Sequence, residues 1–242
     1  MTIKEKYISI IIPANNEERY INKTLINLIK QDYAFFEIIV VLNGCSDETE
    51  SVIKKLINNY KGDKNLNQLI KIHSCNVANV SLARNIGAEK AKGDLLLFLD
   101  ADTILKDDCL KIINSKFKTN HSFATLKVKP DQKNLSFKFL MALKNLMHSS
   151  GFYHGSSGVQ ICRRKDFENI YGFNESIVVK ENKDLIRRLG KYGDYICINN
   201  FCITSMRRFE KWGLLKAAFF WIKQWVLEFS GKLQKTNYEK IR

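Results

Sequence analysis

Two aspartates separated by one small residue, Asp100 and Asp102, form the stretch whose chemistry is easiest to specify. They follow the apolar run Leu95–Leu99 with Ala101 between them, so we expect both carboxylates in an exposed loop at one strand end. Carboxylates this close repel one another and favour a bound cation. Such oxygen ligands suit Mg²⁺ or Mn²⁺ bridging to a diphosphate, which makes both aspartates candidate metal ligands. A turn with aspartates at favoured positions explains the same pattern without a metal.

A second acidic group, Glu181 and Asp184, stands at the opening of a predicted amphipathic helix, with the amide Asn182 and a lysine between them. Acids at a helix start are favoured by the helix dipole alone. The alternative is an acid pair directed into an active site, where a carboxylate can accept a proton from a substrate.

The elements that must position these residues alternate between strand and helix in the first half of the chain. Continuous apolar runs predict buried strands at residues 7–13, 36–43, 68–74 and 94–100. Helices are predicted within residues 14–31, 46–60 and 81–93. Such alternation predicts a parallel sheet with right-handed crossovers. Ligands collect beyond the carboxyl ends of such strands, here at Pro13–Glu17, Leu42–Asp47 and Leu99–Thr103.

Two helix ends are predicted from their capping residues. Ser46 is the N-cap candidate of the second helix, with an incomplete capping box because Thr49 stands three residues later. Gly93 is the C-cap candidate of the third helix. The second half is predicted as helix 106–117, strand 122–130, helix 135–149, a glycine-rich loop at 151–158, a strand and short helix over 159–170, and two strand-like runs at 194–199 and 201–206.

Composition limits the class of protein. The chain has 242 residues, 45% of them hydrophobic, and a formal net charge of +14. This fits a globular chain attracted to nucleic acid, anionic lipid or phosphorylated substrates. The basic residues are spread out and form no reading helix, so we expect no nucleic-acid partner. Six cysteines without metal-ligand spacing are expected to be reduced thiols.

The expected location is cytoplasmic. The start, MTIKEKY, runs into a strand without a cleavage site, and no apolar run reaches the about 18 residues of a membrane span. Residues 208–230 mix tryptophans (Trp212, Trp221, Trp225) with lysines. That composition suits either an interfacial helix on an anionic membrane, placing the protein on the inner face of the plasma membrane, or a helix packed on the domain.

The ordered set of motifs resembles the inverting family 2 glycosyltransferases. The strings that carry it are ISIIIPANNEE, EIIVVLNGCSDET, SLARNIGAEKAKGDLLLFLDADT, SSGVQICRRKDFENIYGFNES, ENKDLIRRLGKYG and TSMRRFEKWG. The resemblance implies an α/β, Rossmann-like A-type fold with a mostly parallel central sheet flanked by helices. It also implies one catalytic domain over residues 1–205, with a nucleotide-binding half (1–103) and an acceptor half (104–205). Residues 206–242 are expected to form a basic, aromatic segment with an amphipathic C-terminal helix.

The resemblance also assigns expected roles to residues of the nucleotide-binding half. The backbone of Pro13 and Ala14, with Glu17 nearby, looks like the loop that holds the nucleotide base. Arg84 matches a position that contacts the nucleotide. In the DAD motif, Asp100 resembles the acid facing the nucleoside and Asp102 the ligand of the metal on the diphosphate, with Ala101 between them in the nucleotide-sugar site.

Two departures from the family pattern matter. Leu42 stands where the family usually has an acid that reads the base, and Asn43 or Asp47 are the available substitutes. Asn182 stands where the family has its general base, and an amide cannot accept a proton near neutral pH. Three explanations remain open: Glu181 or Asp184 acts as the base, the acceptor is already ionised, or the chain binds a nucleotide sugar without efficient transfer.

The expected function is therefore transfer of a sugar from a UDP- or GDP-sugar to a glycan or lipid-linked acceptor. The resemblance implies inversion, dependence on Mn²⁺ or Mg²⁺, and a role in synthesis of cell-surface polysaccharide or glycolipid. The alternative is a non-catalytic nucleotide-sugar-binding protein or partner subunit that has lost the base.

Overall fold

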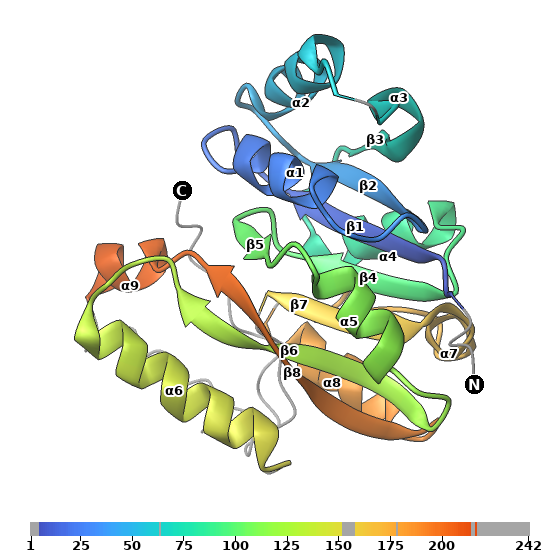
Figure 1. Ribbon diagram of the computed structural model, residues 1–242, viewed down its shortest axis with the longest axis vertical. Coiled ribbons are helices and arrows are strands. Elements are labelled where there is room, and N and C mark those ends of the chain that lie inside the picture. Colours follow the sequence, from blue (N-terminus) through green and yellow to red (C-terminus); the bar gives the residue numbers. More distant parts are fainter. Residues whose placement is uncertain (1–4, 63, 152–157, 178, 214–215, 217–242) are drawn as a thin grey trace.

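The computed structural model describes residues 5–62, 64–151, 158–177, 179–213 and 216. Its centre is one eight-stranded sheet with the strand order β3-β2-β1-β4-β7-β6-β8-β5 (Figure 1). The strands are β1 Ile8–Ala14, β2 Phe36–Asn43, β3 Ile70–Cys75, β4 Leu95–Leu99, β5 Thr103–Leu105, β6 His121–Pro130, β7 Val159–Arg163 and β8 Asp194–Thr204. The helices are α1 Ile21–Ile29, α2 Thr49–Asn59, α3 Leu66–Leu69, α4 Val80–Lys90, α5 Cys109–Lys116, α6 Leu135–Ser149, α7 Arg164–Asn169, α8 Glu181–Leu189 and α9 Arg207–Trp212.

The first half of the sheet is parallel, as the continuous apolar runs predict. β1 lies between β2 and β4 and pairs in parallel with both, and β2 pairs in parallel with β3. All of β2 and all of β4 are buried, because helices cover both faces of the sheet. The carboxyl ends of β1, β2 and β4 therefore meet at one edge.

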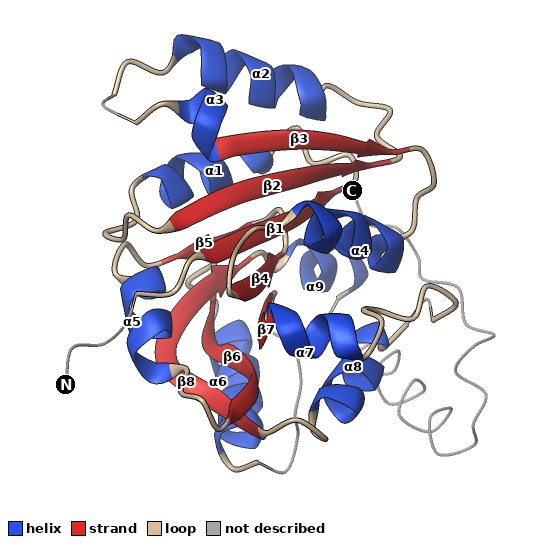
Figure 2. Ribbon diagram, turned by 90° about the vertical axis from the view of Figure 1, so that its right-hand side faces the viewer, coloured by secondary structure: helices blue, strands red, loops and turns tan. Residues whose placement is uncertain are grey.

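Alternate residues of each strand pack into two separate cores. Ile10 of β1 contributes to the core that contains the buried side chains of α1, α5 and α6. Its neighbour Ile11 contributes to the core of α4, α7 and α8. Figure 2 shows these last three helices together on one side of the sheet. This two-faced covering confirms the α/β, Rossmann-like A-type class with a mostly parallel central sheet.

Both predicted helix caps are wrong. α2 begins at Thr49, not beside Ser46, because the backbone N–H of Ser46 donates to Asn16 Oδ1 (2.7 Å) and Asp47 accepts from the N–H of Thr49 (3.1 Å). α4 ends at Lys90, and Gly93 lies beyond it. A Cβ at Gly93 would lie 2.6 Å from the backbone nitrogen of Ser9, so this glycine permits close approach to β1.

The second half differs from the first in its strand directions. β7 is antiparallel to β4 and β6, β6 and β8 are parallel, and β5 is antiparallel to β8. The two strand-like runs predicted at 194–199 and 201–206 form one strand, β8, with a register shift opposite Leu126 and Lys127 of β6. All six cysteines are unpaired thiols, as expected.

The structure describes the C-terminal segment only through α9, residue 213 and residue 216. Apart from these residues, the amphipathic helix predicted within residues 206–242 lies outside the described part of the chain. In the part of the chain that is described, no helix is both long and apolar enough to cross a membrane. The division into residues 1–103, 104–205 and 206–242 stays a prediction.

Candidate active site

The DAD motif lies where the sequence places it, in the loop after β4 at the carboxyl edge of the sheet. The N–H of Asp100 donates to the carbonyl of Gly158 (2.9 Å), and the N–H of Thr103 donates to the carbonyl of Asp100 (3.0 Å). The hydroxyl of Thr24 in α1 donates to the carbonyl of Ala101 (2.7 Å). The loop is therefore fixed from both sides, and its two carboxylates differ in exposure: 46% for the Asp100 side chain and 13% for Asp102.

Arg84 of α4 joins the DAD motif to the start of α8. Its guanidinium donates to Glu181 Oε1 (2.8 Å), Asn182 Oδ1 (3.2 Å) and Asp100 Oδ1 (3.3 Å). Arg84 is 4% exposed and lies over the ring of Phe173, with its guanidinium carbon 5.1 Å from the ring centroid. The sequence predicted these residues as separate motifs, and the structure brings Arg84, Asp100, Glu181 and Asn182 into one cluster.

Asp184 is engaged elsewhere, although it shares the first turn of α8 with Glu181. Its carboxylate pairs with Arg187 (3.1 Å) and Arg188 (2.8 Å). Arg188 in turn donates to the carbonyls of Ile170 and Gly172. Asp184 therefore stabilises the connection between α7 and α8, and of the two acids Glu181 is the one placed beside the DAD motif.

A second ionic cluster forms around Arg207 at the start of α9. Its guanidinium makes two bonds to the carboxylate of Glu17, at 2.6 and 2.8 Å, and lies 3.2 Å from Asp102 Oδ2. It also lies 4.6 Å from the ring centroid of Tyr20. Glu17 and Asp102 were both predicted site residues, but Arg207 was missed. The available signal was the arginine pair in TSMRRFEKWG, which carried the family resemblance without an assigned role.

Burial and charge change the ionisation of this cluster. Burial raises the pKa of the Asp102 carboxyl to about 7, since the raising effects of Asp100 and Glu17 add to it and the Arg207 cation only partly opposes it. Burial lowers the pKa of the Arg207 guanidinium, but the bond to Glu17 and the charges of Asp102 and Glu17 outweigh it, so the pKa lies above its ordinary value. Arg207 thus remains a cation beside a carboxyl that takes up a proton near neutral pH.

The predicted nucleotide-base residues lie at the ends of β1 and β2. Pro13 is partly exposed and Ala14 is buried. Asn43 is buried, and its side-chain oxygen accepts from the N–H of Asn79 (2.8 Å), the N-cap residue of α4. Leu42 is buried in the core of α1. Asp47 accepts from the N–H groups of Glu18 (3.2 Å) and Thr49 (3.1 Å), so both substitutes for the missing acid already hold local structure.

The two aspartates could supply only part of the coordination of a divalent cation, and water or phosphate oxygens would have to supply the rest. Among the described residues, no group of three or more histidine, cysteine, aspartate or glutamate side chains is arranged to hold a metal ion. Mg²⁺ is commonly bound through one or two carboxylates together with substrate phosphates. Asp102 and Asp100 offer that number of carboxylates on one loop, so the chemistry of the donor set fits a metal that also binds a diphosphate.

Comparison with known proteins tests the family resemblance. The family described as "Glycosyl transferase family 2" matches residues 9–170. A Haemophilus influenzae protein described as an uncharacterized glycosyltransferase is 35% identical over 104 residues, which is 43% of this chain and 39% of that protein. The Staphylococcus aureus poly(ribitol-phosphate) beta-N-acetylglucosaminyltransferase TarS is 30% identical over 116 residues, 47% of this chain and 19% of TarS. The matched parts are thus well under two thirds of these relatives.

Solved structures show the same fold at low sequence identity. The Pyrobaculum calidifontis mannosyltransferase PcManGT, in complex with GDP-Man and Mn²⁺, superposes with a TM-score of 0.71 at 14% identity, covering 94% of this chain and 65% of that one. TarS residues 1–349 in complex with UDP-GlcNAc superpose with a TM-score of 0.62 at 20% identity, covering 83% and 59%. Since the family match covers well over half of the sequence and the fold agrees, this chain belongs to glycosyl transferase family 2.

Proposed function

We propose that this chain transfers a sugar, with inversion, from a UDP- or GDP-sugar to a glycan or lipid-linked acceptor, with Mn²⁺ or Mg²⁺ as cofactor. The observation that carries the proposal is the Arg84 cluster, which joins the DAD loop to the acidic start of α8 through bonds of 2.8 to 3.3 Å. A metal-and-diphosphate site and a proton acceptor are the two parts that such a transfer needs, and Arg84 bonds to residues that we propose for each part.

The relatives support this substrate class. TarS is named for its poly(ribitol-phosphate) acceptor and N-acetylglucosaminyl donor group. A Methanococcus voltae relative, 36% identical over 107 residues, is named as a dolichyl N-acetyl-alpha-D-glucosaminyl phosphate glucuronosyltransferase. Those residues cover 43% of this chain and 32% of that relative. We therefore propose that this chain acts in the synthesis of cell-surface polysaccharide or glycolipid at the cytoplasmic face of the membrane. We propose residues 208–230 as its membrane contact.

Each part of the site then has a role in the transfer. Glu181 accepts the proton of the acceptor hydroxyl as that oxygen attacks the sugar, and Arg84 holds the Glu181 carboxylate in place. Asn182 positions the acceptor through its amide. Asp102 and Asp100 hold the divalent cation, which when bound supplies positive charge against the leaving nucleoside diphosphate.

A second candidate function is a nucleotide-sugar-binding subunit without efficient transfer. One observation favours it: the acids of the α8 start are already paired, Glu181 with Arg84 and Asp184 with two arginines. A transferase whose acceptor is already ionised would also need no base. In both cases Asn182 would not act as a base, because an amide does not accept a proton near neutral pH.

A donor screen separates the two functions. Full-length protein is incubated with UDP- and GDP-sugars, with and without Mn²⁺, and scored by thermal shift and by release of nucleoside diphosphate. The transferase predicts at least one donor that raises the melting temperature and is turned over, both only with metal. A donor that stabilises the protein but is never cleaved, with or without membrane extract as acceptor source, indicates the binding subunit.

A further inference from the structure

The outer face of α6 carries a continuous band of exposed apolar side chains. Their exposed fractions are 79% for Leu135, 73% for Phe139, 67% for Leu146, 47% for Leu143 and 43% for Met147. We call these five residues the α6 band. Apolar residues exposed singly are ordinary, but a contiguous apolar patch of this kind marks a surface that binds something.

The band and the packed side of α6 face in opposite directions. Phe137, Met141 and His148 of the same helix are buried, and the first two belong to the core shared with β6. At about 100° per residue, band members at spacings of three and four positions fall on one arc of the helix, and Phe137 and Met141 fall across from it. Figure 1 shows α6 at the outer margin of the molecule, alongside β6.

The exposed charge of α6 itself is positive. The helix has two lysines, Lys138 and Lys144, and no acidic residue. Lys144 does not contribute to this surface, because it is only partly exposed and its charge acts on Cys202 and Asp100. Lys138 is exposed, and so is Lys133, which precedes the helix. The ammonium of Lys129 on β6 lies 4.3 Å from the ring centroid of Phe201 on β8, at the edge of the same surface.

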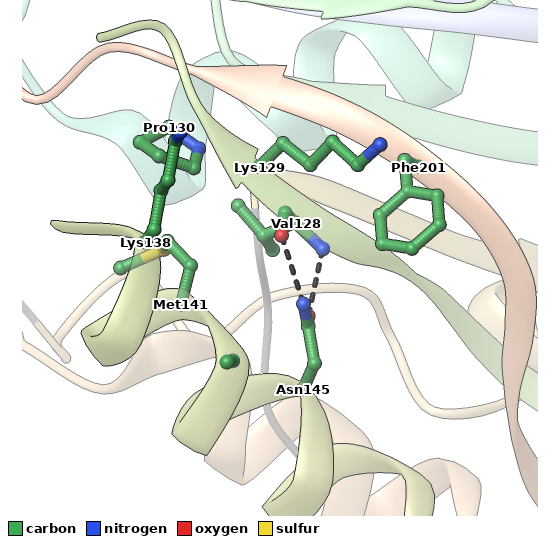
Figure 3. Close-up of a pocket in the computed structure, with 8 residues that line it drawn as sticks. Val128, Lys129, Pro130, Lys138, Met141, Asn145 and Phe201 are labelled. Carbon is green, nitrogen blue, oxygen red and sulfur yellow. Dashed lines mark hydrogen bonds between the residues drawn. The ribbon is translucent and has the colours of Figure 1, made fainter. Parts of the chain in front are cut away.

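A cavity of about 360 Å³ between α6 and the sheet extends this surface (Figure 3). Asn145 fixes its inner end by bonding the N–H and the carbonyl of Val128, at 2.7 and 2.8 Å. Lys129 and Lys138 line the cavity together with apolar side chains. None of its lining residues belongs to the Arg84 or Arg207 clusters, so it is a separate feature from the candidate active site.

These observations favour a lipid surface over a second copy of the chain. In a symmetric dimer each subunit presents the same face, so two positively charged surfaces would lie against each other. An anionic bilayer instead offers hydrocarbon to the band and negative headgroups to the lysines. We propose that α6 docks this protein on an anionic membrane surface through the α6 band, with Lys129 and Lys138 at the headgroups.

The packed side of α6, opposite to the band, adjoins the candidate active site. Phe137 of α6 contacts Phe209 of α9, with ring centroids 6.2 Å apart, and α9 carries Arg207. The proposal rests on the surface of α6 alone, not on the proposed function. It therefore stands or fails independently of whether the chain transfers a sugar.

Vesicle sedimentation of the full-length chain tests the proposal. Vesicles of phosphatidylcholine alone are compared with vesicles that contain phosphatidylglycerol. The test variant is Phe139→Ser/Leu146→Ser, which changes exposed side chains and should leave folding intact. Val77→Ser/Tyr171→Asn is the matched control, since these two side chains are 60% and 93% exposed in loops outside α6. Trp221→Ser/Trp225→Ser tests the tail.

We expect the wild type and the matched control to sediment with the anionic vesicles, and the α6 variant to lose at least about tenfold in partitioning. Added salt should weaken binding because the lysines contribute. Binding that is unchanged in the α6 variant overturns the proposal, whatever the tail variant does. A wild-type dimer in sedimentation velocity that the α6 variant converts to monomer overturns it in favour of a second copy.

Discussion

The guanidinium of Arg84 lies 2.8 Å from the carboxylate of Glu181, a residue 97 positions further along the chain. Both side chains are nearly inaccessible, at 5% and 11% exposed. This ion pair ties α4 to α8 and, through the second nitrogen of Arg84, to Asp100 of the DAD loop. The two parts of the candidate active site thus depend on one arginine.

Removing the positive charge at this point should destabilise the fold. Arg84→Met leaves Glu181 buried without its cation, and we expect the free energy of unfolding to fall by about 3–5 kcal/mol in urea titrations. Lys54→Met, which breaks an exposed pair with Glu50, is the control and should cost about 1 kcal/mol or less. Equal losses in both variants would contradict a buried structural role for Arg84.

The acids at the start of α8 should differ in their effect on turnover. Glu181→Gln removes the proposed proton acceptor beside the DAD loop, so kcat should fall by about 10²–10⁴-fold. Asp184→Asn acts on ion pairs with Arg187 and Arg188 and should change kcat by less than about tenfold. Initial rates of nucleoside diphosphate release with a glycan acceptor give both values. Full activity of Glu181→Gln would remove side-chain base catalysis by this residue.

Arg207 should compete with a divalent cation for Asp102. Its guanidinium lies 3.2 Å from the Asp102 carboxylate, so Arg207→Gln removes a positive charge from beside the proposed metal ligand. We expect Mn²⁺ alone to bind several-fold more tightly to the variant, because the repulsion between two neighbouring cations is gone. Mn²⁺ electron paramagnetic resonance titration measures this directly. Arg187→Gln, at a 75% exposed side chain, is the control and should bind Mn²⁺ as the wild type does.

The raised pKa of Asp102 predicts a pH-dependent stability. Its folded value of about 7 exceeds the ordinary value of about 3.9, so the folded state holds an extra proton in that window and loses stability as pH rises through it. The difference in free energy of unfolding, wild type minus Asp102→Asn, should fall by about 2 kcal/mol between about pH 5 and pH 7. Urea titrations without metal at each pH give this difference.

Asp47→Asn is the control for that titration. Burial raises the pKa of Asp47, but the hydrogen bonds from Thr49 and from the backbone of Glu18 outweigh it and leave that pKa below its ordinary value. Its stabilising contribution is therefore lost only as pH falls below the ordinary pKa of an aspartate. The free energy of unfolding of the wild type minus that of Asp47→Asn should then stay constant over about pH 5 to 7. If the difference between wild type and Asp102→Asn is also constant over this pH range, the raised pKa of Asp102 is contradicted.

Gly158 should be needed for the shape of the DAD loop. Its φ is +79°, and a Cβ there would lie 2.6 Å from Thr103 Oγ1 and 3.5 Å from Asp100 Oδ2. Gly151 has a similar φ of +75° with nothing within 4 Å of the added Cβ. We expect Gly158→Ala to cost about 1–3 kcal/mol more than Gly151→Ala in thermal or urea unfolding. Equal costs would show that the contact with Thr103 relaxes freely.

The sequence predicted most of the first half because local and global preferences agree there. β2 has the predicted bounds, Phe36–Asn43, since a short continuous apolar run rich in β-branched residues is typical of a strand buried on both faces. The position of Asp100 and Asp102 followed from the end of such a run at Leu99. The predicted N-cap at Ser46 was wrong because the contact of Ser46 with Asn16, a tertiary contact, holds Ser46 outside the helix.

What could not be predicted depends on contacts between distant segments. Arg207 and Glu17 are 190 positions apart, and only the return of the chain after β8 brings them together. Glu181 and Asp184 share one helical turn, so sequence spacing alone left both as candidate bases. The partner of Glu181, Arg84, comes from the distant helix α4 and could not be predicted. The partner of Asp184, Arg188, lies four residues later on α8, so that pair agrees with helical spacing.

The central claim, a metal-dependent nucleotide-sugar site built on the DAD loop, is tested most directly by calorimetric titration of UDP and GDP. The wild type and Asp102→Ala are each titrated with and without Mn²⁺. We predict that one of the two nucleotides binds the wild type only when Mn²⁺ is present, and that Asp102→Ala abolishes this binding. Nucleotide binding that needs no metal and is unchanged in Asp102→Ala would contradict the account.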